Sequence, residues 1–376
     1  MHKKPLAPHL FTRRSVLAGA AGLLAFGNAT GTFAQQRKAG PYFKTKDELD
    51  QSLKTFGVGS WDRSSLLKQA RPTTILSSTA LEDKEIPVGA SKIGGAPDMP
   101  EETDWPMRKP SSSGKRDVDV LRKLNAENPS PYYQQMIDAK ELLANRDAPL
   151  AFVLQFDLAA AAAIGPVDPD IPTDGRLLVF FDLVLLPWFG EQQAEKSFSL
   201  LYLPAAQSEL KRRPVPDLGM ALWGERHEGD TDEQAMRLPS ARIDPTFSYT
   251  LPGDGSYPML TRYPYPQEPP HRAWLDALTS GPGDGCQLYG WPNFVQSDPA
   301  IDLGAEDVKF DLPRNDDYIR TIRGLAGPIE NWIPLLTITG YASDSVDFNG
   351  GYYVMIRRTD LRNKDFSKAV IVYQTD

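Results

Sequence analysis

The sequence has few of the residues from which common catalytic and metal sites are built. It contains one cysteine and four histidines in 376 residues. A single cysteine excludes an intrachain disulfide, and scattered histidines with one cysteine cannot form a typical zinc site. The chain also lacks the Gly-x-Ser-x-Gly run that holds the nucleophilic serine of an α/β-hydrolase. We therefore predict no cofactor.

Long hydrophobic runs are also missing, and the apolar run near the N-terminus is typical of an export signal. Arg13 and Arg14 precede a short, Gly/Ala-rich segment at 18–26, whereas a membrane span needs about 20 apolar residues. Small residues then offer a cleavage position after Ala34, with Ala29 as an alternative. This pattern predicts a twin-arginine (Tat) signal peptide over residues 1–34, a periplasmic or secreted location, and no membrane span in the mature form.

The charge balance is acidic. The full chain carries a formal charge of -8. Removal of residues 1–34 takes away four basic residues and no acidic one, so the mature chain carries -12. Such a surface repels nucleic-acid phosphates, and we predict no nucleic-acid partner. The basic cluster at 211–213 is predicted to be a solvated face.

Apolar runs of strand length predict a sheet-rich fold. The segments 150–158 and 175–183 are nearly continuously apolar, as in strands covered on both faces. Further strands are predicted at 75–78, 199–204, 237–252, 332–340, 351–358 and 369–374. Helices are predicted at 46–56, 61–70, 131–145 and 271–278. The polar residues 108–130 are predicted to be an inserted excursion.

One three-part order occurs twice in the sequence. A turn with glycine before proline precedes two apolar strand segments, first at 93–97 and again at 288–292. This order predicts an α+β, sheet-rich single domain at 75–376, built from two diverged, pseudo-twofold-related repeats with short peripheral helices. The repeats are expected at about 90–204 and 286–376, after a helical lead at 35–74. A cleft is expected where the repeats meet.

Several motifs in this order resemble those of the DUF1963 (YwqG-like) family. They are Ser91-Lys92-Ile93-Gly94-Gly95-x-Pro97 with Trp105-Pro106, Pro149-Leu150-x-Phe152 with Gln155, Gly175-x-Leu177-x-x-Phe180-Phe181, His271 before Leu288-x-Gly290-x-Pro292 with Gln296, and Asp365-Phe366-Ser367. The resemblance covers roughly 75–374. It implies an α+β fold with an extended sheet, and it supplies no chemistry. The chain departs from the family pattern in its export signal, in the excursion at 108–148 and at 338–341.

We predict a non-enzymatic binding module that holds a protein, peptide or small ligand in the cleft between the repeats. The cleft is expected to include Lys92, Gly94, Gly95, Pro97, Trp105, Gln155, Asp157, His271, Gly290, Trp291, Pro292 and Gln296. Aromatic side chains in the two turns could stack on a ligand, although core packing is the preferred interpretation of both tryptophans. The alternative is a hydrolase or transferase that uses His271 or a carboxylate such as Asp157, and it requires Gln155, Asp157 and His271 to converge.

The remaining polar groups are assigned structural or solvated roles. His227 and His271 are predicted to lie at the solvated surface or to cap a helix. Calcium is not excluded at Asp168-x-Asp170-x-x-x-Asp174 or at 228–233, but neither segment has EF-hand spacing, and a hydrated acidic loop is preferred. Cys286 is predicted to be a structural thiol.

Overall fold

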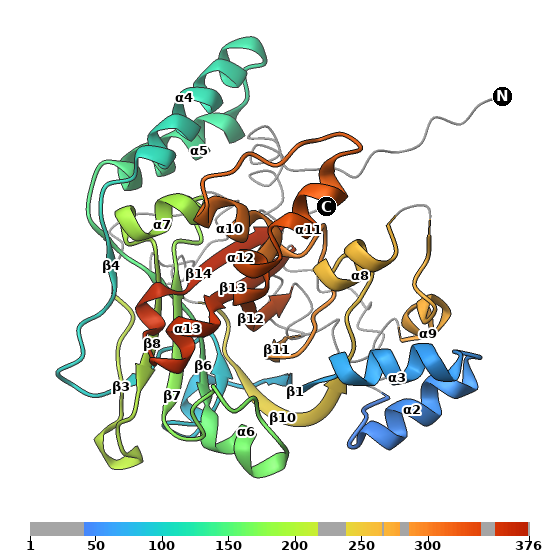
Figure 1. Ribbon diagram of the computed structural model, residues 1–376. Coiled ribbons are helices and arrows are strands. Elements are labelled where there is room, and N and C mark those ends of the chain that lie inside the picture. Colours follow the sequence, from blue (N-terminus) through green and yellow to red (C-terminus); the bar gives the residue numbers. More distant parts are fainter. Residues whose placement is uncertain (1–40, 217–237, 265–266, 279–285, 340–349, 375–376) are drawn as a thin grey trace.

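The computed structural model describes residues 41–216, 238–264, 267–278, 286–339 and 350–374. Most of its strands form one large, nearly closed antiparallel sheet (Figure 1). From edge to edge the strands are β14 (Val370–Gln374), β13 (Gly351–Arg357), β12 (Trp332–Thr339), β11 (Gln287–Leu288), β1 (Arg71–Ala80), β10 (Ala241–Thr250), β2 (Lys92–Ile93), β6 (Ala151–Asp157), β7 (Arg176–Phe181) and β8 (Phe198–Leu203). The edge strands β8 and β14 contact each other, so the sheet curls around its own core.

Two small ladders and a set of short helices complete the described part of the fold. The ladders pair β3 (Asp98–Met99) with β9 (Lys211–Arg212) and β4 (Met107–Arg108) with β5 (Ala148–Pro149). The helices are α2 (Lys46–Thr55), α3 (Ser60–Gln69), α4 (Ser112–Glu127), α5 (Pro131–Ala144), α6 (Leu158–Ile164), α7 (Phe189–Glu195), α8 (Tyr257–Arg262), α9 (Arg272–Ala277), α10 (Pro299–Asp307), α11 (Tyr318–Gly324), α12 (Ala326–Asn331) and α13 (Arg358–Arg362). The predicted α+β class is confirmed. Within the described ranges, none of the helices has the length and apolar character needed to cross a bilayer.

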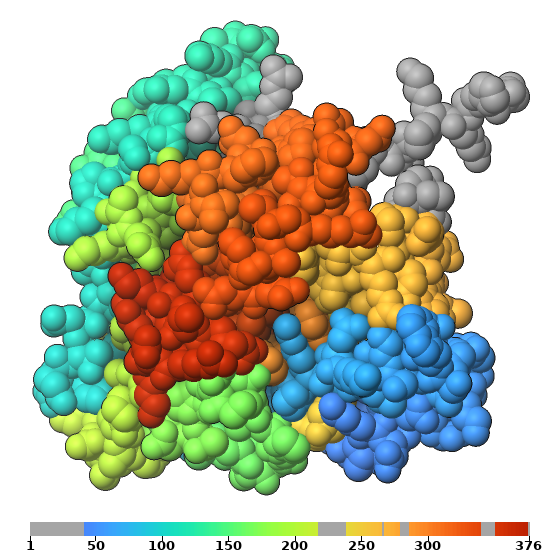
Figure 2. Space-filling view, viewed as in Figure 1, coloured from blue at the N-terminus to red at the C-terminus, as the bar shows by residue number. Residues whose placement is uncertain are grey.

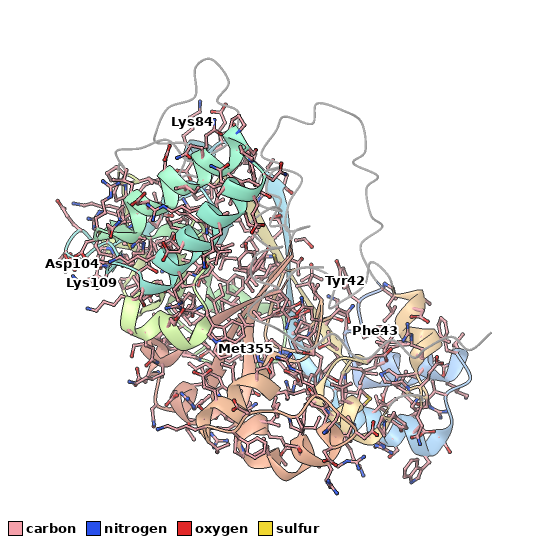
Figure 3. All side chains as sticks on the ribbon, turned by 90° about the horizontal axis from the view of Figure 1, so that it is seen from above. Tyr42, Phe43, Lys84, Asp104, Lys109 and Met355 are labelled. Atoms are coloured by element: carbon pink, nitrogen blue, oxygen red, sulfur yellow. The ribbon has the colours of Figure 1, made fainter. Side chains whose placement is uncertain are left out.

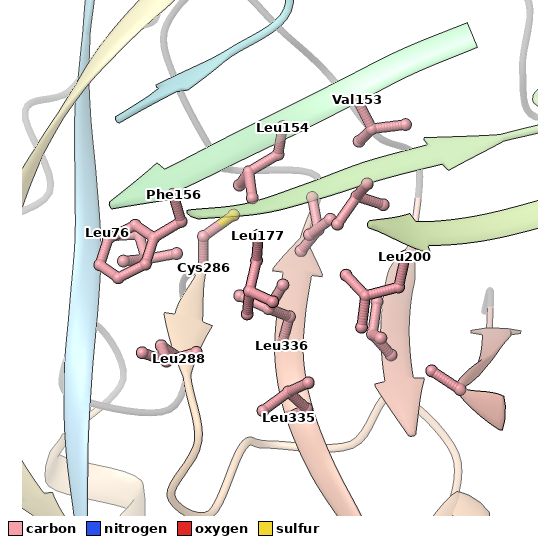
Figure 4. Packing of buried hydrophobic residues seen from close by; sticks show 14 of the residues in the cluster. Leu76, Val153, Leu154, Phe156, Leu177, Leu200, Cys286, Leu288, Leu335 and Leu336 are labelled. Carbon is pink, nitrogen blue, oxygen red and sulfur yellow. The ribbon is translucent and has the colours of Figure 1, made fainter. Parts of the chain in front are cut away.

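The apolar runs of the sequence form the core on both faces of the sheet. On the inner face Leu154, Leu177 and Leu336 pack together with Cys286 (Figure 4). Burial raises the pKa of the Cys286 thiol to about 12, as expected for a structural thiol. On the other face Met355 packs in a second cluster with residues of α10 and α12, and Figure 3 places it near the centre of the molecule. Removal of apolar surface from water on both faces is the main driving force for this arrangement.

The strands flank a central antiparallel pair in a regular order. β1 pairs with β10 along its whole length, from Arg71 opposite Thr250 to Ala80 opposite Ala241. Beyond β10 follow β2, β6, β7 and β8, and beyond β1 follow β11, β12, β13 and β14. On each side a two-residue strand is therefore followed, in chain order, by three longer strands. The strand predicted at 237–252 is β10, which lies at the centre of the sheet.

The excursion predicted at 108–130 contains a helix that the sequence pattern does not predict, because most of these residues form α4. The hydroxyl of Ser111 caps the helix by accepting a hydrogen bond from a backbone N–H of the first turn. Val118 and Leu121 are buried against α5 residues such as Met136. These few apolar positions are diluted by polar residues, which hides the helical pattern. The α4–α5 hairpin projects from the body of the molecule (Figures 1 and 2).

The N-terminal lead is attached to the sheet. Its two predicted helices are confirmed as α2 and α3. The backbone N–H of Phe43 donates to Ser248 Oγ at 2.9 Å, and the Phe43 ring packs on Trp274 of α9 with 5.7 Å between ring centroids. The first strand begins at Arg71, four residues before the predicted start at 75. The last residues assigned to the lead therefore belong to a central strand.

Candidate functional site

The predicted site residues lie in two separate sets. One set surrounds β2 and contains Lys92, Gly94, Gly95, Pro97, Trp105, Gln155 and Asp157. The other surrounds the turn after β11 and contains His271, Gly290, Trp291, Pro292 and Gln296. β2 pairs with β10 at Ala241, whereas β11 pairs with β1 at Thr74, which lies opposite Phe247 of β10. These positions are six residues apart along β10, roughly 20 Å at 3.4 Å per residue. The structure does not bring the two sets into one cleft.

The first set is built around a buried lysine. The side chain of Lys92 is fully buried, and its Nζ donates to Asp83 Oδ1 at 2.8 Å. Asp98 Oδ2 lies 3.9 Å from the same nitrogen, and Arg212 Nε donates to Asp98 Oδ1 at 2.9 Å. Burial lowers the pKa of Lys92, because it disfavours the charged amine. We call Asp83, Lys92, Asp98, Gln155 and Arg212 the Lys92 cluster.

Asp98 is the centre of the Lys92 cluster. Its Oδ2 accepts hydrogen bonds from Gln155 Nε2 at 2.7 Å and from the Gly89 N–H at 2.8 Å. Burial alone raises the pKa of Asp98, but the hydrogen bonds from Arg212 and the charge of Lys92 hold it below its usual range. The charges of the cluster are paired with one another. This arrangement fastens loops to the sheet. Because the Asp98 carboxylate is already paired with Lys92 and Arg212, it is not available to bind a ligand.

The two glycines of the first turn are required by the backbone. Gly94 and Gly95 have φ of +61° and +69°. A Cβ on Gly94 would lie 2.2 Å from the carbonyl oxygen of Pro239, so only glycine fits there. The carbonyl of Pro97 accepts a hydrogen bond from the Arg213 N–H at 2.8 Å. The basic cluster at 211–213 therefore makes hydrogen bonds within the fold. Its prediction as a solvated face is wrong for Arg212, whose guanidinium is paired with Asp98.

The other members of the first set have structural partners. Trp105 Nε1 donates to the Leu150 carbonyl at 2.9 Å, and its ring meets Phe180 edge-on at 5.3 Å. This is core packing, as preferred from the sequence. Asp157 caps α6 by accepting the Ala159 N–H at 3.1 Å.

The surface role predicted for His271 is wrong, because the residue is buried. Its side chain is fully buried, and Nε2 lies 3.0 Å from the carbonyl oxygen of Pro252. It occupies the N-cap position of α9 without a side-chain capping bond. Burial lowers the pKa of His271. Gln155 lies opposite Lys92, which pairs with Arg242 of β10, whereas Pro252 follows the end of β10. The distance along β10 from Arg242 to its last residue, 250, is roughly 27 Å. Gln155 and Asp157 therefore do not converge with His271, as the enzymatic alternative requires.

The second turn is fixed against β1 and β10. Gly290 has φ of +87°, and a Cβ there would lie 2.6 Å from Thr73 Cβ and 2.7 Å from Thr250 Oγ1. The Trp291 N–H donates to Thr250 Oγ1 at 2.7 Å, and Trp291 Nε1 donates to the Gln69 carbonyl at 2.8 Å. The indole is buried, so Trp291 also packs in the core.

The segment that follows this turn is anchored to the edge of the sheet. The Val295 N–H donates to Tyr353 Oη of β13 at 3.0 Å. The Gln296 N–H donates to Gln374 Oε1 of β14 at 3.0 Å, and Gln374 Nε2 donates to the Ser297 carbonyl at 2.7 Å. These bonds hold residues 292–297 in a defined conformation.

A cavity of about 270 Å³ lies beside this anchored segment. We call it the loop pocket. It is lined by the loop Gly253–Gly255, by Arg272, Leu275 and Asp276 of α9, and by the segment Pro292–Phe294. Pro292 of the second set therefore lines the pocket, and His271 directly precedes a lining residue. The sequence offers only an indirect signal for the pocket, since the loop and α9 carry no recognisable motif.

The charged groups of the loop pocket are linked through one arginine, which pairs with two aspartates. Arg272 Nε donates to Asp276 Oδ1 at 2.8 Å, and Arg272 Nη1 donates to Asp254 Oδ2. The hydrogen bond that Arg272 donates to Asp276 and the charge of Asp254 raise the pKa of Arg272. Two carboxylates and one guanidinium leave the pocket with one net negative charge. None of the described lining residues is a serine, cysteine, lysine or histidine, so the lining has no hydroxyl, thiol or amine nucleophile with an adjacent imidazole base.

The acidic loop at 168–174, which the sequence left open as a calcium site, is held by arginines. Arg358 Nη1 donates to Asp168 Oδ1 at 3.1 Å and to Asp170 Oδ2 at 2.7 Å, and Arg362 Nε donates to Asp170 at 3.1 Å. The preferred prediction of a hydrated acidic loop is therefore wrong for Asp168 and Asp170, whose carboxylates are paired with arginines. In the ranges that the structure describes, no three His, Cys, Asp or Glu side chains gather as a metal site would need. His227 and the acidic residues at 228–233 lie outside the described residues.

The model of one protein family, described as Domain of unknown function (DUF1963), matches residues 91–375. The chain belongs to the DUF1963 family. The DUF1963 match begins one residue before Lys92 and includes both glycine turns and the loop pocket. It confirms the resemblance carried by the sequence motifs. No curated protein has a significant match to this chain.

Proposed function

We propose that this DUF1963 protein is a non-enzymatic binding module that holds a small polar ligand in the loop pocket. The observation that carries the proposal is a polar cavity with one anchored wall and, among its lining residues, no hydroxyl, thiol or amine nucleophile. Its volume of about 270 Å³ is just below the range of roughly 300–1,000 Å³ that is typical of pockets for drug-sized ligands. A smaller ligand is therefore expected.

The lining indicates the chemistry of this ligand. Asp254 and Asp276 outnumber Arg272, so a neutral or cationic ligand is favoured over an anion. Phe294 supplies apolar surface on the opposite wall. Hydrogen bonds to Tyr353 and to β14 fix this wall before a ligand arrives, which lowers the entropy cost of binding.

The binding proposal is tested by filling the loop pocket. Gly255 has room for a side chain, because a Cβ there has no neighbour closer than 3.6 Å. Gly255→Phe should occlude the cavity, and Gly327→Phe is a matched control on a helix position with nothing within 4 Å. In native mass spectrometry of protein isolated from its own cells, the wild type and the control should carry a small-molecule adduct that Gly255→Phe lacks. An adduct retained by Gly255→Phe would place binding elsewhere.

We also propose that the protein is exported as a folded chain by the twin-arginine route. Arg13 and Arg14 before the short apolar run at 18–26 support this proposal, and so does the small residue Ala34 at the expected cleavage position. Cell fractionation should find the wild type outside the cytoplasm with a new N-terminus at residue 35. The double change Arg13→Lys and Arg14→Lys should keep the protein inside, and unchanged export would contradict the proposal.

We further propose that the sheet arose by duplication of one unit. The strand order on the two sides of the β1–β10 pair supports this, and so do matching details. Gly94 and Tyr289 follow the two short strands with φ of +61° and +56°. Their N–H groups donate to Val153 and Leu335, at 2.9 and 2.7 Å, and each acceptor lies at a register irregularity of the next strand. Superposition of 92–203 on 287–374 in a crystal structure should align these positions, and a mismatch in strand order would refute duplication.

A further inference from the structure

Arg71 is a partly buried arginine with a shielded guanidinium nitrogen that donates no hydrogen bond. It begins β1, and its guanidinium carbon lies 3.5 Å from the ring centroid of Trp291 and 5.5 Å from that of Tyr289. Nη1 is shielded from solvent and donates no hydrogen bond. Among the described residues, no carboxylate forms an ion pair with this guanidinium. The side chain is nevertheless partly exposed.

Asp168 and Asp298, the carboxylates that interact electrostatically with Arg71, are bonded to other groups. Asp168 and Asp170 are bonded to Arg358. Asp298 accepts the backbone N–H of Ala300 at the start of α10 and that of Tyr257 at the start of α8, and burial raises the pKa of its carboxyl group. The charge of Arg71 is therefore not balanced by a partner of its own. A shielded donor without an acceptor is unusual in proteins and calls for a water, an ion or a ligand.

We propose that Arg71 is the anchor of a second site, separate from the loop pocket, that binds the carboxylate or phosphate group of a small ligand. A guanidinium offers parallel N–H groups that match two oxygens of such an anion. Trp291 holds the guanidinium plane by stacking. The indole is itself fixed by its bonds to Gln69 and Thr250. The site thus has a cation whose plane is oriented before the anion binds.

The site lies where distant parts of the chain meet. The loop at 168–170 comes from the connection between β6 and β7, Tyr289 comes from the turn after β11, and Arg358 begins α13. Arg358 Nη2 donates to Tyr289 Oη at 3.0 Å, which fixes the second aromatic ring beside Arg71. The opposite charge preference of the loop pocket allows the two sites to be tested independently.

The test measures anion binding to the mature protein by isothermal titration calorimetry and by tryptophan fluorescence, at constant ionic strength with chloride as the reference. The probes are acetate, succinate and inorganic phosphate. We expect one of them to bind with a dissociation constant below about 10 mM. Arg71→Lys keeps the charge but loses the paired N–H groups, and should weaken binding by about tenfold or more. The matched control Arg242→Lys, at an exposed arginine of β10, should bind as the wild type does.

The outcomes separate the sources of the anion and the possible failures. Binding of acetate or succinate alone assigns a carboxylic acid, and binding of phosphate alone assigns a phosphate ester. If Arg71→Lys does not fold, the unfolding temperature of the wild type is measured with each of the same probes, since an anion that binds the folded protein raises this temperature. Equal affinity in wild type and Arg71→Lys, or no response of the wild type to any probe, would overturn the proposal. Anion binding that persists in Gly255→Phe would separate this site from the loop pocket.

Discussion

Replacement of Asp98 by asparagine should destabilise the protein strongly, because Asp98 is the fully buried carboxylate of the Lys92 cluster. The asparagine side chain would keep the shape of the aspartate but would leave Lys92 and Arg212 short of a negative charge. Breaking a buried ion pair by removing one partner costs about 3–5 kcal/mol. The amide can still accept one hydrogen bond, for example from the Gly89 N–H, so we expect a loss of about 3 kcal/mol, the low end of that range.

The assay is urea unfolding at neutral pH, with the midpoint and slope compared for Asp98→Asn and wild type. The matched control Asp317→Asn removes an exposed carboxylate paired with Arg320 and should cost less than about 1 kcal/mol. The folded pKa of Asp98 lies below its ordinary 3.8. Its stabilising contribution is therefore complete above about pH 3.8 and is lost as the pH falls through the folded pKa. A loss no larger than that of the control would refute the assigned role of the cluster.

Three further predictions concern the turns, the hairpin and the buried histidine. Gly290→Ala should lower the free energy of unfolding by about 2–4 kcal/mol, through left-handed backbone strain and overpacking. The control Gly57→Ala, at a position with φ of +77° but nothing within 4 Å, should lower it by about 1–2 kcal/mol. Equal losses of stability in thermal unfolding would contradict this prediction. Glu195 accepts hydrogen bonds from the start of α4, which hold its pKa below 4.5 despite burial. Glu195→Gln should therefore speed amide hydrogen exchange in α4. In the wild type, amide exchange in the α4–α5 hairpin should become faster as the pH falls through the folded pKa of Glu195. Burial lowers the pKa of His271 below 6.5, so stability should be complete above about pH 6.5 and fall as the pH drops toward the folded pKa; the same pH dependence in His271→Gln would exclude this histidine as its source.

The sheet could be predicted from the sequence because its strands are uniform apolar runs. β6 and β7 are recognisable from 150–158 and 175–183, since strands covered on both faces need apolar residues at successive positions. α4 is not recognisable, because it buries only a narrow stripe against α5 and its remaining positions are polar. Short helices such as α6 carry too few residues for a periodic signal.

The candidate sites are harder to predict, because they depend on contacts between residues far apart in the chain. Lys92 and Gln155 stand out in the sequence, but their partner Arg212 lies 57 residues beyond Gln155, and its sequence neighbours suggest a solvated surface. Arg71 carries no motif, and its significance follows only from the stacking on Trp291 and from the missing acceptor. Local sequence patterns cannot show that a charge lacks a partner.

The most direct test of ligand binding in the loop pocket is a crystal structure of the mature protein, isolated from its own cells without denaturation. We predict density for a small polar molecule that contacts Asp254 or Asn293. A protein that carries a ligand by native mass but holds only water in this pocket would contradict the account.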